Sequence, residues 1–349
     1  MAVATEQLWA EHATEIACDE SGWEGTNLVA GSSEVMAYAS VCLSVEAAQA
    51  SIQALSGRVR SRGLEYKASH LLRAGRQSNV TWLLGAEGPL QGKARVHLTD
   101  KTFFVVCRIL DVFVGGYVDT ASAGLVQDPR LVDMARTLCR VGEDAFGHER
   151  WRAFLATSNT VLKRTRRPVV RGPVDAFFAQ VDALHRLDGQ NQVGEILDVL
   201  RQARPTAYDA RVHLLESQVL QPALEPLIPA IARTVLHWGS DQQTVTIVHD
   251  EQSALTKRRL AGLEQTLASP PVELLRPPGQ GQFIHLRQVD SRSEPRVQIA
   301  DLLAGVARKI ATEELHGSSD GEHSALLRSY IDPASHWCHE QSWQRLKPQ

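Results

Sequence analysis

The chain has 349 residues, of which 43% are hydrophobic and 22% charged, and a net charge of −3. This composition is ordinary for a globular protein. The charge excludes a global positive field, so a nucleic-acid partner would have to bind at a local basic patch. At roughly 150 residues per domain, the length predicts two domains or one elaborated domain.

The cysteines and the apolar runs indicate the compartment. The five cysteines are odd in number, widely spaced and without a C-x-x-C pair, which argues against a disulfide framework or a zinc ribbon. The N-terminal segment MAVATEQLWAEHATEIA carries acids and lacks the basic and apolar regions of a signal peptide. No uninterrupted apolar run is long enough for a membrane span. We therefore expect a cytoplasmic protein with no membrane partner.

The first third of the chain carries β-strand patterns. Residues 13–19 predict a short strand, and residues 34–44 predict its hairpin partner. Residues 46–60 are Ala-rich and predict a helix. Strong β-formers over residues 94–114 predict a second strand region.

From about residue 127 to 240 the pattern becomes helical. The candidate helices span residues 129–145, 149–164, 173–187, 192–203 and 209–238. Pro222, Pro226 and Pro229 predict that the last of these helices is split or kinked, because proline removes a backbone donor and clashes with the preceding turn.

The β-strand patterns return after residue 240. Residues 244–250 and 282–290 predict strands, with a helix over residues 257–267 between them. Pro295 opens a helix over residues 296–312 at the favoured first-turn position. The tail, residues 320–349, is short, polar and aromatic.

Strand patterns at both ends therefore flank a helical middle. The simplest assembly is one mixed sheet built by both ends of the chain, with a helical insertion at one edge. We predict an α/β fold whose core combines residues 1–126 with residues 241–349, and an insertion over residues 127–240.

Three aspartates occupy special places in this arrangement. Asp19 ends the first strand, Asp250 ends the strand over 244–250, and Asp301 lies in the apolar helix over 296–312. Open α/β sheets place ligands at the carboxyl ends of their strands. A buried carboxylate needs a partner, a metal or a proton, and Mg²⁺ and Mn²⁺ prefer oxygen ligands. The pattern predicts a Mg²⁺ or Mn²⁺ site shared by the three aspartates.

Each aspartate also has a purely structural interpretation. Asp19 could belong to a turn, and Asp250 could cap the following helix. Asp301 could form a structural salt bridge with Arg308 or Arg296. The metal-site interpretation depends on the three aspartates occurring together at sheet ends and on a buried helix.

Four motifs in a fixed order carry a family resemblance. The motifs are Asp19-Glu20-Ser21-Gly22, Lys67 in Glu65-Tyr66-Lys67-Ala68-Ser69, Asp250 after Ile247-Val248-His249, and Gln298-Ile299-Ala300-Asp301-Leu302, with Asp290-Ser291 also fitting. With them the chain resembles the bacterial and phage proteins grouped as domain of unknown function 3800. The resemblance implies an RNase H-like fold and an acidic metal site of the retroviral-integrase and Holliday-resolvase kind. It places Asp19, Asp250 and Asp301 in that site, with Glu20 assisting, and implies nothing about the helical middle.

Other polar residues extend the predicted site. Lys67 would face a phosphate near the metals, with a solvated surface lysine as the alternative. Ser21 and Gln298 are polar enough to hold the carboxylates in place as a second layer around the metal.

Residues 150–171 form the basic stretch of the chain, with seven Lys and Arg residues and no acid. Such clusters neutralise phosphates and give salt-dependent binding. We expect nucleic-acid contacts at Arg164, Arg166 and Arg167. The alternative is a solvated helix face paired with nearby acids.

These features together favour a metal-dependent nuclease. Asp19 would bridge two metal ions, Asp250 and Asp301 would hold one each, and Lys67 would stabilise charge on the reacting phosphate. One alternative is a non-catalytic RNase H-like module that binds nucleic acid or a protein. Another is a hydrolase of a small phosphorylated substrate, which the basic stretch disfavours. The sequence has no Walker A, G-x-G-x-x-G, H-E-x-x-H or G-x-S-x-G motif.

Overall fold

The computed structural model describes residues 13–59, 71, 77–116, 128–165, 169–187, 192–216, 223–239, 244–267, 283–319 and 321–348. The elements in chain order are β1 (Thr14–Ser21), β2 (Val35–Val41), α2 (Val45–Val59), α4 (Gln77–Leu84), β3 (Ala94–Asp100), α5 (Lys101–Phe113), α6 (Pro129–Phe146), α7 (His148–Leu162), α8 (Arg171–His185), α9 (Gln192–Gln202), α10 (Arg204–Glu216), α11 (Leu227–Trp238), β4 (Val245–Asp250), α12 (Lys257–Leu267), β5 (Phe283–Val289), η2 (Ser291–Ser293), α14 (Pro295–Leu315), α15 (Glu322–Leu327), η3 (Arg328–Tyr330) and α16 (Glu340–Leu346). Among these described residues, no helix is both long and apolar enough to span a membrane.

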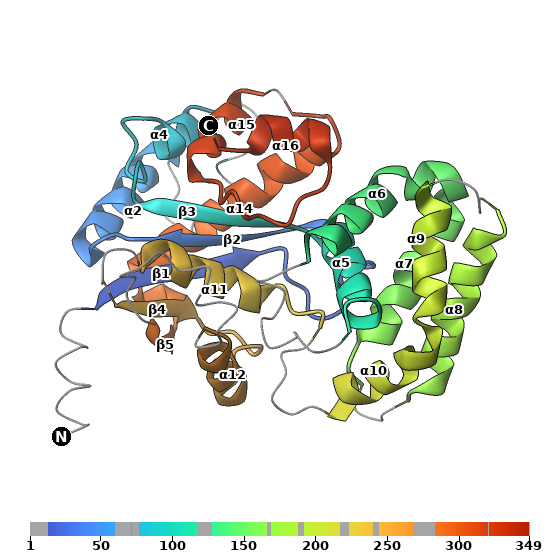
Figure 1. The fold of residues 1–349 in the computed structure, drawn as a ribbon. Helices are drawn as coiled ribbons and strands as arrows, with labels where there is room; N and C mark the ends of the chain where they lie inside the picture. Colours follow the sequence, from blue (N-terminus) through green and yellow to red (C-terminus); the bar gives the residue numbers. More distant parts are fainter. Residues whose placement is uncertain are drawn as a thin grey trace, which may run out of the picture.

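One mixed sheet joins the two ends of the chain (Figure 1). Its strand order is β3-β2-β1-β4-β5. Strand β2 runs antiparallel to both of its neighbours, whereas β1, β4 and β5 run parallel. This order and polarity are those of an RNase H-like sheet, so the predicted fold class is confirmed. The parallel pairing of β1 with β4 brings their carboxyl ends to the same edge of the sheet.

Helices cover both faces of the sheet. Ala17 and Val248 belong to the core that packs against α14, together with α2 and α4. Ile16 and Ile247 belong to the opposite core, against α11 and α12. Because successive side chains of a strand point to opposite faces, both faces of β1 and β4 are apolar. That explains the consecutive apolar residues in the middle of each strand, Ile16 to Cys18 in β1 and Ile247 to Val248 in β4.

The strand predicted over residues 94–114 is right only for its first half. Strand β3 ends at Asp100, and residues 101–113 form the helix α5 instead. The Asp100 carboxylate accepts a hydrogen bond from the backbone N–H of Phe103, which is a helix N-cap. Nearly every residue of α5 is buried. A helix that is buried on all sides is rich in apolar residues, including Val, Ile and Phe, which are also common in strands. The strand prediction was wrong here because it used that composition.

The helices that follow β3 enclose a second core. Helices α5 to α10 pack around it, and its centre holds Phe113, Phe154, Phe177 and Phe178 with ring centroids 5.1 to 6.0 Å apart. The helix predicted over residues 209–238 is split as expected, into α10 and α11. Of these two helices, only α11 packs against the sheet. The exact boundaries of the insertion, residues 127–240, stay a prediction.

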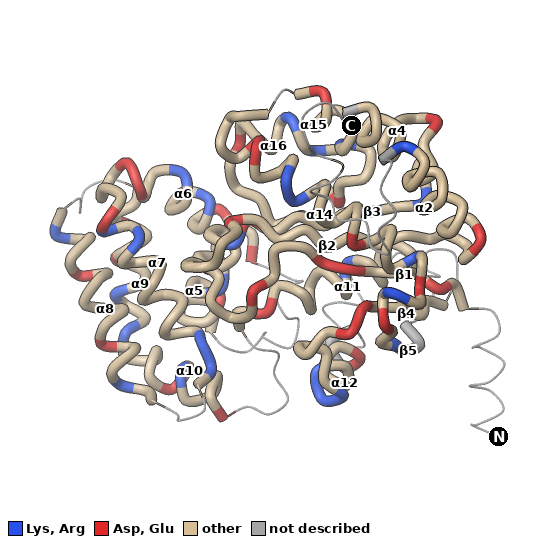
Figure 2. Tube along the Cα trace, turned by 180° about the vertical axis from the view of Figure 1, so that it is seen from behind, with Lys and Arg blue, Asp and Glu red and all other residues tan. Residues whose placement is uncertain are grey.

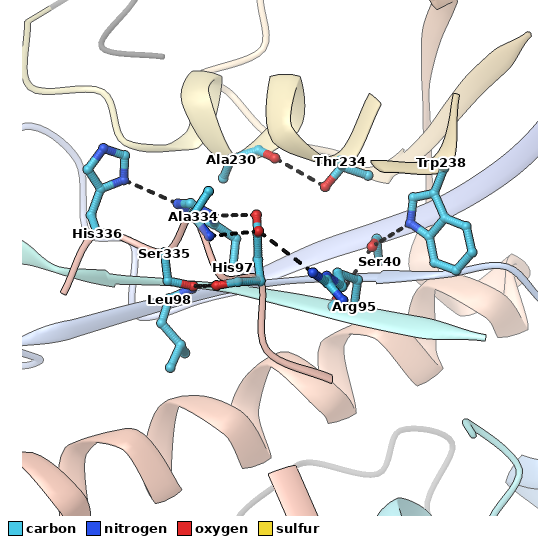
Figure 3. A network of polar contacts seen from close by, with 11 residues as sticks. Ser40, Arg95, His97, Leu98, Ala230, Thr234, Trp238, Ala334, Ser335 and His336 are labelled. Atoms are coloured by element: carbon cyan, nitrogen blue, oxygen red, sulfur yellow. Dashed lines mark hydrogen bonds and ion pairs between the residues drawn. The ribbon is translucent and has the colours of Figure 1, made fainter. Parts of the chain in front are cut away.

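The C-terminal segment is attached to the outer side of β3 (Figure 3). The backbone N–H groups of Asp332 and His336 donate to carbonyls of β3 at 2.7 and 2.9 Å. Between them, His97 of β3 places Nδ1 3.1 Å from the Asp332 carboxylate and Nε2 3.2 Å from His336 Nδ1. The tail thereby covers an edge strand that would otherwise expose its backbone to other chains.

This buried network predicts a pH-dependent stability. Burial opposes ionisation of Asp332, but the hydrogen bond and charge of His97 outweigh it and hold the pKa of Asp332 well below its ordinary value. Burial lowers the pKa of His336 to about 3. Groups with a depressed pKa in the folded state contribute stability above their unfolded pKa and lose it as the pH falls. Acid should therefore destabilise the attachment of the tail.

We predict that Asp332→Asn lowers the free energy of unfolding by about 2 kcal/mol at neutral pH, because it removes hydrogen bonds to a charged group. The difference from the wild type should narrow below about pH 4, where the aspartate of the unfolded chain becomes protonated. Urea denaturation at a series of pH values measures both the loss of unfolding free energy and its dependence on pH. A difference that stays constant down to about pH 3 contradicts a role for the ionised carboxylate.

Candidate metal centre

Three predicted carboxylates lie near one another where the pairing of β1 with β4 ends. Cys18 pairs with His249 in the parallel register, so Asp19 and Asp250 each follow by one residue. Both have the strand parity of the residues that face α14, the helix that carries Asp301. Figure 2 shows acidic positions near β1 and β4, with basic positions among them and on α12.

The electrostatics of Asp19 reflect this convergence. Asp19 is 8% exposed, and burial is the largest cause that raises its pKa, to about 9. The negative charges of Glu20, Asp301 and Asp250 act in the same direction. The backbone N–H of Glu20 donates to Asp19 Oδ1 at 2.8 Å and opposes them only in part. A proton or a cation is therefore needed to stabilise this group of carboxylates.

A histidine completes the group. One ligand atom each of Asp19, Glu20 and His249 lie within 4.8 Å of one another. His249 is fully buried, and its Nδ1 lies 2.9 Å from the carbonyl oxygen of Asp250. A carbonyl only accepts, so we assign the ring proton to Nδ1, which leaves a lone pair on Nε2. This is the arrangement by which histidine binds metals in proteins.

Two buried acceptors face each other in this group. His249 Nε2 lies 3.5 Å from Glu20 Oε2. Neither atom has a hydrogen-bond partner among the described residues. The other oxygen of Glu20 accepts from the amide of Gln252. Two unsatisfied acceptors at this distance are costly without a shared proton or cation, so the residues fit a divalent ion.

Gln298, which the sequence predicted to support the carboxylates, acts through the backbone of Ser291. Asp250 Oδ1 accepts from the backbone N–H of Ser291 at 3.0 Å. Gln298 donates to the Ser291 carbonyl at 2.8 Å and thus holds the loop that holds Asp250. Ser21 contacts no carboxylate in the hydrogen bonds described, and its Oγ accepts from Arg308 Nε at 3.0 Å.

The two arginines considered as partners for Asp301 have other contacts. Arg296 pairs with Glu294 at 2.8 Å and with Glu15 at 2.9 Å. Arg308 donates to the hydroxyls of Ser21 and Ser33.

Two buried ionisable residues escape the sequence prediction. His249 precedes Asp250, but strand alternation assigns it to the opposite face of the sheet. Glu225 is 3% exposed, accepts from Trp23 Nε1 at 2.9 Å and pairs with Arg259 at 3.2 Å. Burial raises the pKa of Glu225 to about 7. Its sequence context, between prolines, gives no signal of this position.

The predicted nucleic-acid contacts are described only in part. Lys67, Arg166 and Arg167 lie outside the described residues. Arg164 donates to the carbonyl of Leu215 at 3.2 Å and so connects α7 to the end of α10. Their role in binding stays a prediction. Trp151 and Phe154, the aromatic residues of the basic stretch, are buried in the insertion core and are not available to stack on bases.

The fold and the site define an RNase H-like α/β protein with an acidic, histidine-containing group suited to a divalent cation. No protein-family model, no curated protein and no solved structure matches the chain. The interpretation of the site therefore depends on its geometry.

We predict that Asp19→Asn leaves the melting temperature of the metal-free protein unchanged or raises it. Burial and the charges of Glu20, Asp301 and Asp250 already keep the Asp19 carboxyl protonated when no cation is bound, so a neutral amide of nearly the same shape costs little. The rise in melting temperature that Mn²⁺ causes in the wild type, through binding to the folded state, should disappear. Asp209→Asn, an exposed carboxylate on α10, is the control and should keep that rise. A large loss of stability in the metal-free Asp19→Asn protein would show a structural role instead.

Proposed function

We propose that the protein is a metal-dependent nuclease, a phosphodiesterase that acts on nucleic acid. The observation that carries the proposal is the pair of unsatisfied buried acceptors, Glu20 Oε2 and His249 Nε2, beside Asp19. They lie at the carboxyl end of the central strands of an RNase H-like sheet. Membership of the family that the motifs resemble, domain of unknown function 3800, is part of this proposal.

Each side chain has a role in this proposal. Asp19 holds the centre of the site, between Asp250 from the neighbouring strand and Asp301 from α14. Glu20 and His249 extend the set of ligands around the end of β1. Bound Mn²⁺ or Mg²⁺ ions would activate water and neutralise charge on the phosphodiester. The imidazole ligand favours Mn²⁺ over Mg²⁺, because nitrogen ligands suit transition metals better than Mg²⁺.

The supporting contacts fix these ligands before a cation binds. The Ser291 N–H and the loop held by Gln298 orient Asp250. The Glu20 N–H orients Asp19, and the Asp250 carbonyl fixes the His249 ring. A module that only binds nucleic acid has no need for buried repelling carboxylates and unsatisfied acceptors, so this arrangement favours the enzyme over the binding module.

We predict that the purified protein cleaves labelled DNA or RNA in the presence of Mn²⁺, and that EDTA abolishes cleavage. The test uses single-stranded DNA, double-stranded DNA and RNA in parallel, with Mn²⁺ and Mg²⁺ compared. Asp301→Asn should lower the rate by at least about 100-fold, because it removes a charge on which metal binding depends.

Glu251→Gln is the matched control for this test. It removes a carboxylate next to Asp250, but the side chain is exposed and has no described partner. Its rate should stay close to that of the wild type. Cleavage that survives in Asp301→Asn, or that is insensitive to EDTA, would contradict the proposal.

A further inference from the structure

Two cations meet beyond the metal centre, where β2 begins. Lys101, the first residue of α5, is 1% exposed and donates from Nζ to the carbonyl oxygen of Ser33 at 2.6 Å. Arg308 of α14 donates to Ser21 Oγ at 3.0 Å and to Ser33 Oγ at 3.5 Å. Within the described part of the chain, neither cation has a carboxylate at ion-pair distance.

Such a pair is unfavourable without an anion. An ammonium group has three donors, and Lys101 uses one of them. Burial lowers the pKa of Lys101, and the charge of Arg308 acts in the same direction. The carboxylate of Glu24 acts against them from a distance, but it accepts hydrogen bonds from Ser32. A buried cation is stable when it is paired, so this arrangement suits an anionic ligand.

Gly22 makes room for the arginine. Its φ of +88° is left-handed, which favours glycine. A Cβ atom at this position would lie 2.6 Å from Arg308 Cδ and 2.3 Å from the Val35 carbonyl oxygen. The glycine at the end of the Asp19-Glu20-Ser21-Gly22 motif thus allows Arg308 to reach Ser21.

A cavity lies beside this pair. Its volume is about 710 Å³, and Ser33 and Lys101 line its wall on the core side. Arg140 and Arg152 line the wall formed by the insertion, and both are exposed. Two of the acids at this cavity are already paired with histidines, Glu143 with His148 and Glu34 with His316. Asp100 also lines it and accepts from the backbone N–H of Phe103 and from Cys338, and Glu340 is a further acid of the wall. Lys101, Arg140 and Arg152 are the Lys and Arg side chains of the wall, and Arg308 adjoins it through its contact with Ser33.

We propose that Lys101 and Arg308 bind phosphate groups of a polynucleotide strand that runs from the metal centre into this cavity. The inference rests on the proposed nuclease function, since it identifies where the strand continues beyond the scissile phosphate. Arg308 lies two turns of α14 beyond Asp301, or about 10.5 Å along the helix axis. A stacked strand covers that distance in roughly three nucleotide steps of 3.4 Å.

The test measures binding without cleavage. A fluorescein-labelled single-stranded oligonucleotide is titrated in Ca²⁺ buffer at several salt concentrations and followed by fluorescence anisotropy. Lys101→Met and Arg308→Gln should each weaken binding and flatten the slope of log K against log salt by about 0.7, the value for one phosphate contact with a single strand. Lys309→Met is the matched control, because it removes the same charge one residue along α14, where Lys309 pairs with Glu313. Its slope should be unchanged.

A second readout separates this inference from the proposed function. The rise in melting temperature with Mn²⁺ should persist in both variants, because neither residue touches the metal ligands in the contacts described. Weaker binding with that rise retained supports the phosphate site. Unchanged binding with the rise retained overturns the phosphate site and leaves the nuclease proposal standing. A wild type whose melting temperature does not rise with Mn²⁺ contradicts the nuclease proposal itself.

Inorganic phosphate provides an independent probe. Phosphate should raise the melting temperature of the wild type but not that of Lys101→Met. This substitution removes the buried charge and keeps an apolar side chain of similar length. If Arg308→Gln does not fold, this comparison and the anisotropy of Lys101→Met decide the question. A wild type that binds neither the oligonucleotide nor phosphate overturns the inference.

Discussion

The parallel pairing of β1 with β4 is the constraint on which the rest of the structure depends. These strands come from opposite ends of the chain, and their register sets Cys18 beside His249. Asp19 and Asp250 therefore both follow the last pair of the two strands, Asp250 at the end of β4 and Asp19 two residues before the end of β1. A slip of one residue by either strand would move the carboxylate of that strand to the other face, away from α14 and Asp301. The long chain between the two strands can form a separate helical body without disturbing that register.

The site combines side chains from both faces of the sheet. Asp19 and Asp250 have the parity of the α14 face, whereas Glu20 and His249 have the parity of the α11 face. One ligand atom each of Asp19, Glu20 and His249 nevertheless lie within 4.8 Å of one another, beside the point where β1 stops pairing with β4. The resulting repulsion costs stability, and proteins commonly accept such a cost at functional sites.

The sequence predicted what local periodicity encodes. The strand patterns located Asp19 and Asp250, and the apolar helix located Asp301. The spacing of apolar residues along the sequence is enough to predict such strands and such a helix. It failed at α5, where the Asp100 cap outweighs a β-rich composition. It also missed the role of His249, because alternation assigns that residue to the other face. Arg308 was considered only as a partner for Asp301, since its contact with Ser33 joins segments far apart in the chain.

The central claim is that the residues at the ends of β1 and β4 hold a divalent metal. A crystal soaked in Mn²⁺ and measured for anomalous scattering tests it most directly. The account predicts an anomalous peak within bonding distance of Asp19, with Glu20 and His249 or with Asp250 and Asp301 as further ligands. No peak there at a Mn²⁺ concentration that raises the melting temperature, or a peak only at surface carboxylates, would contradict it.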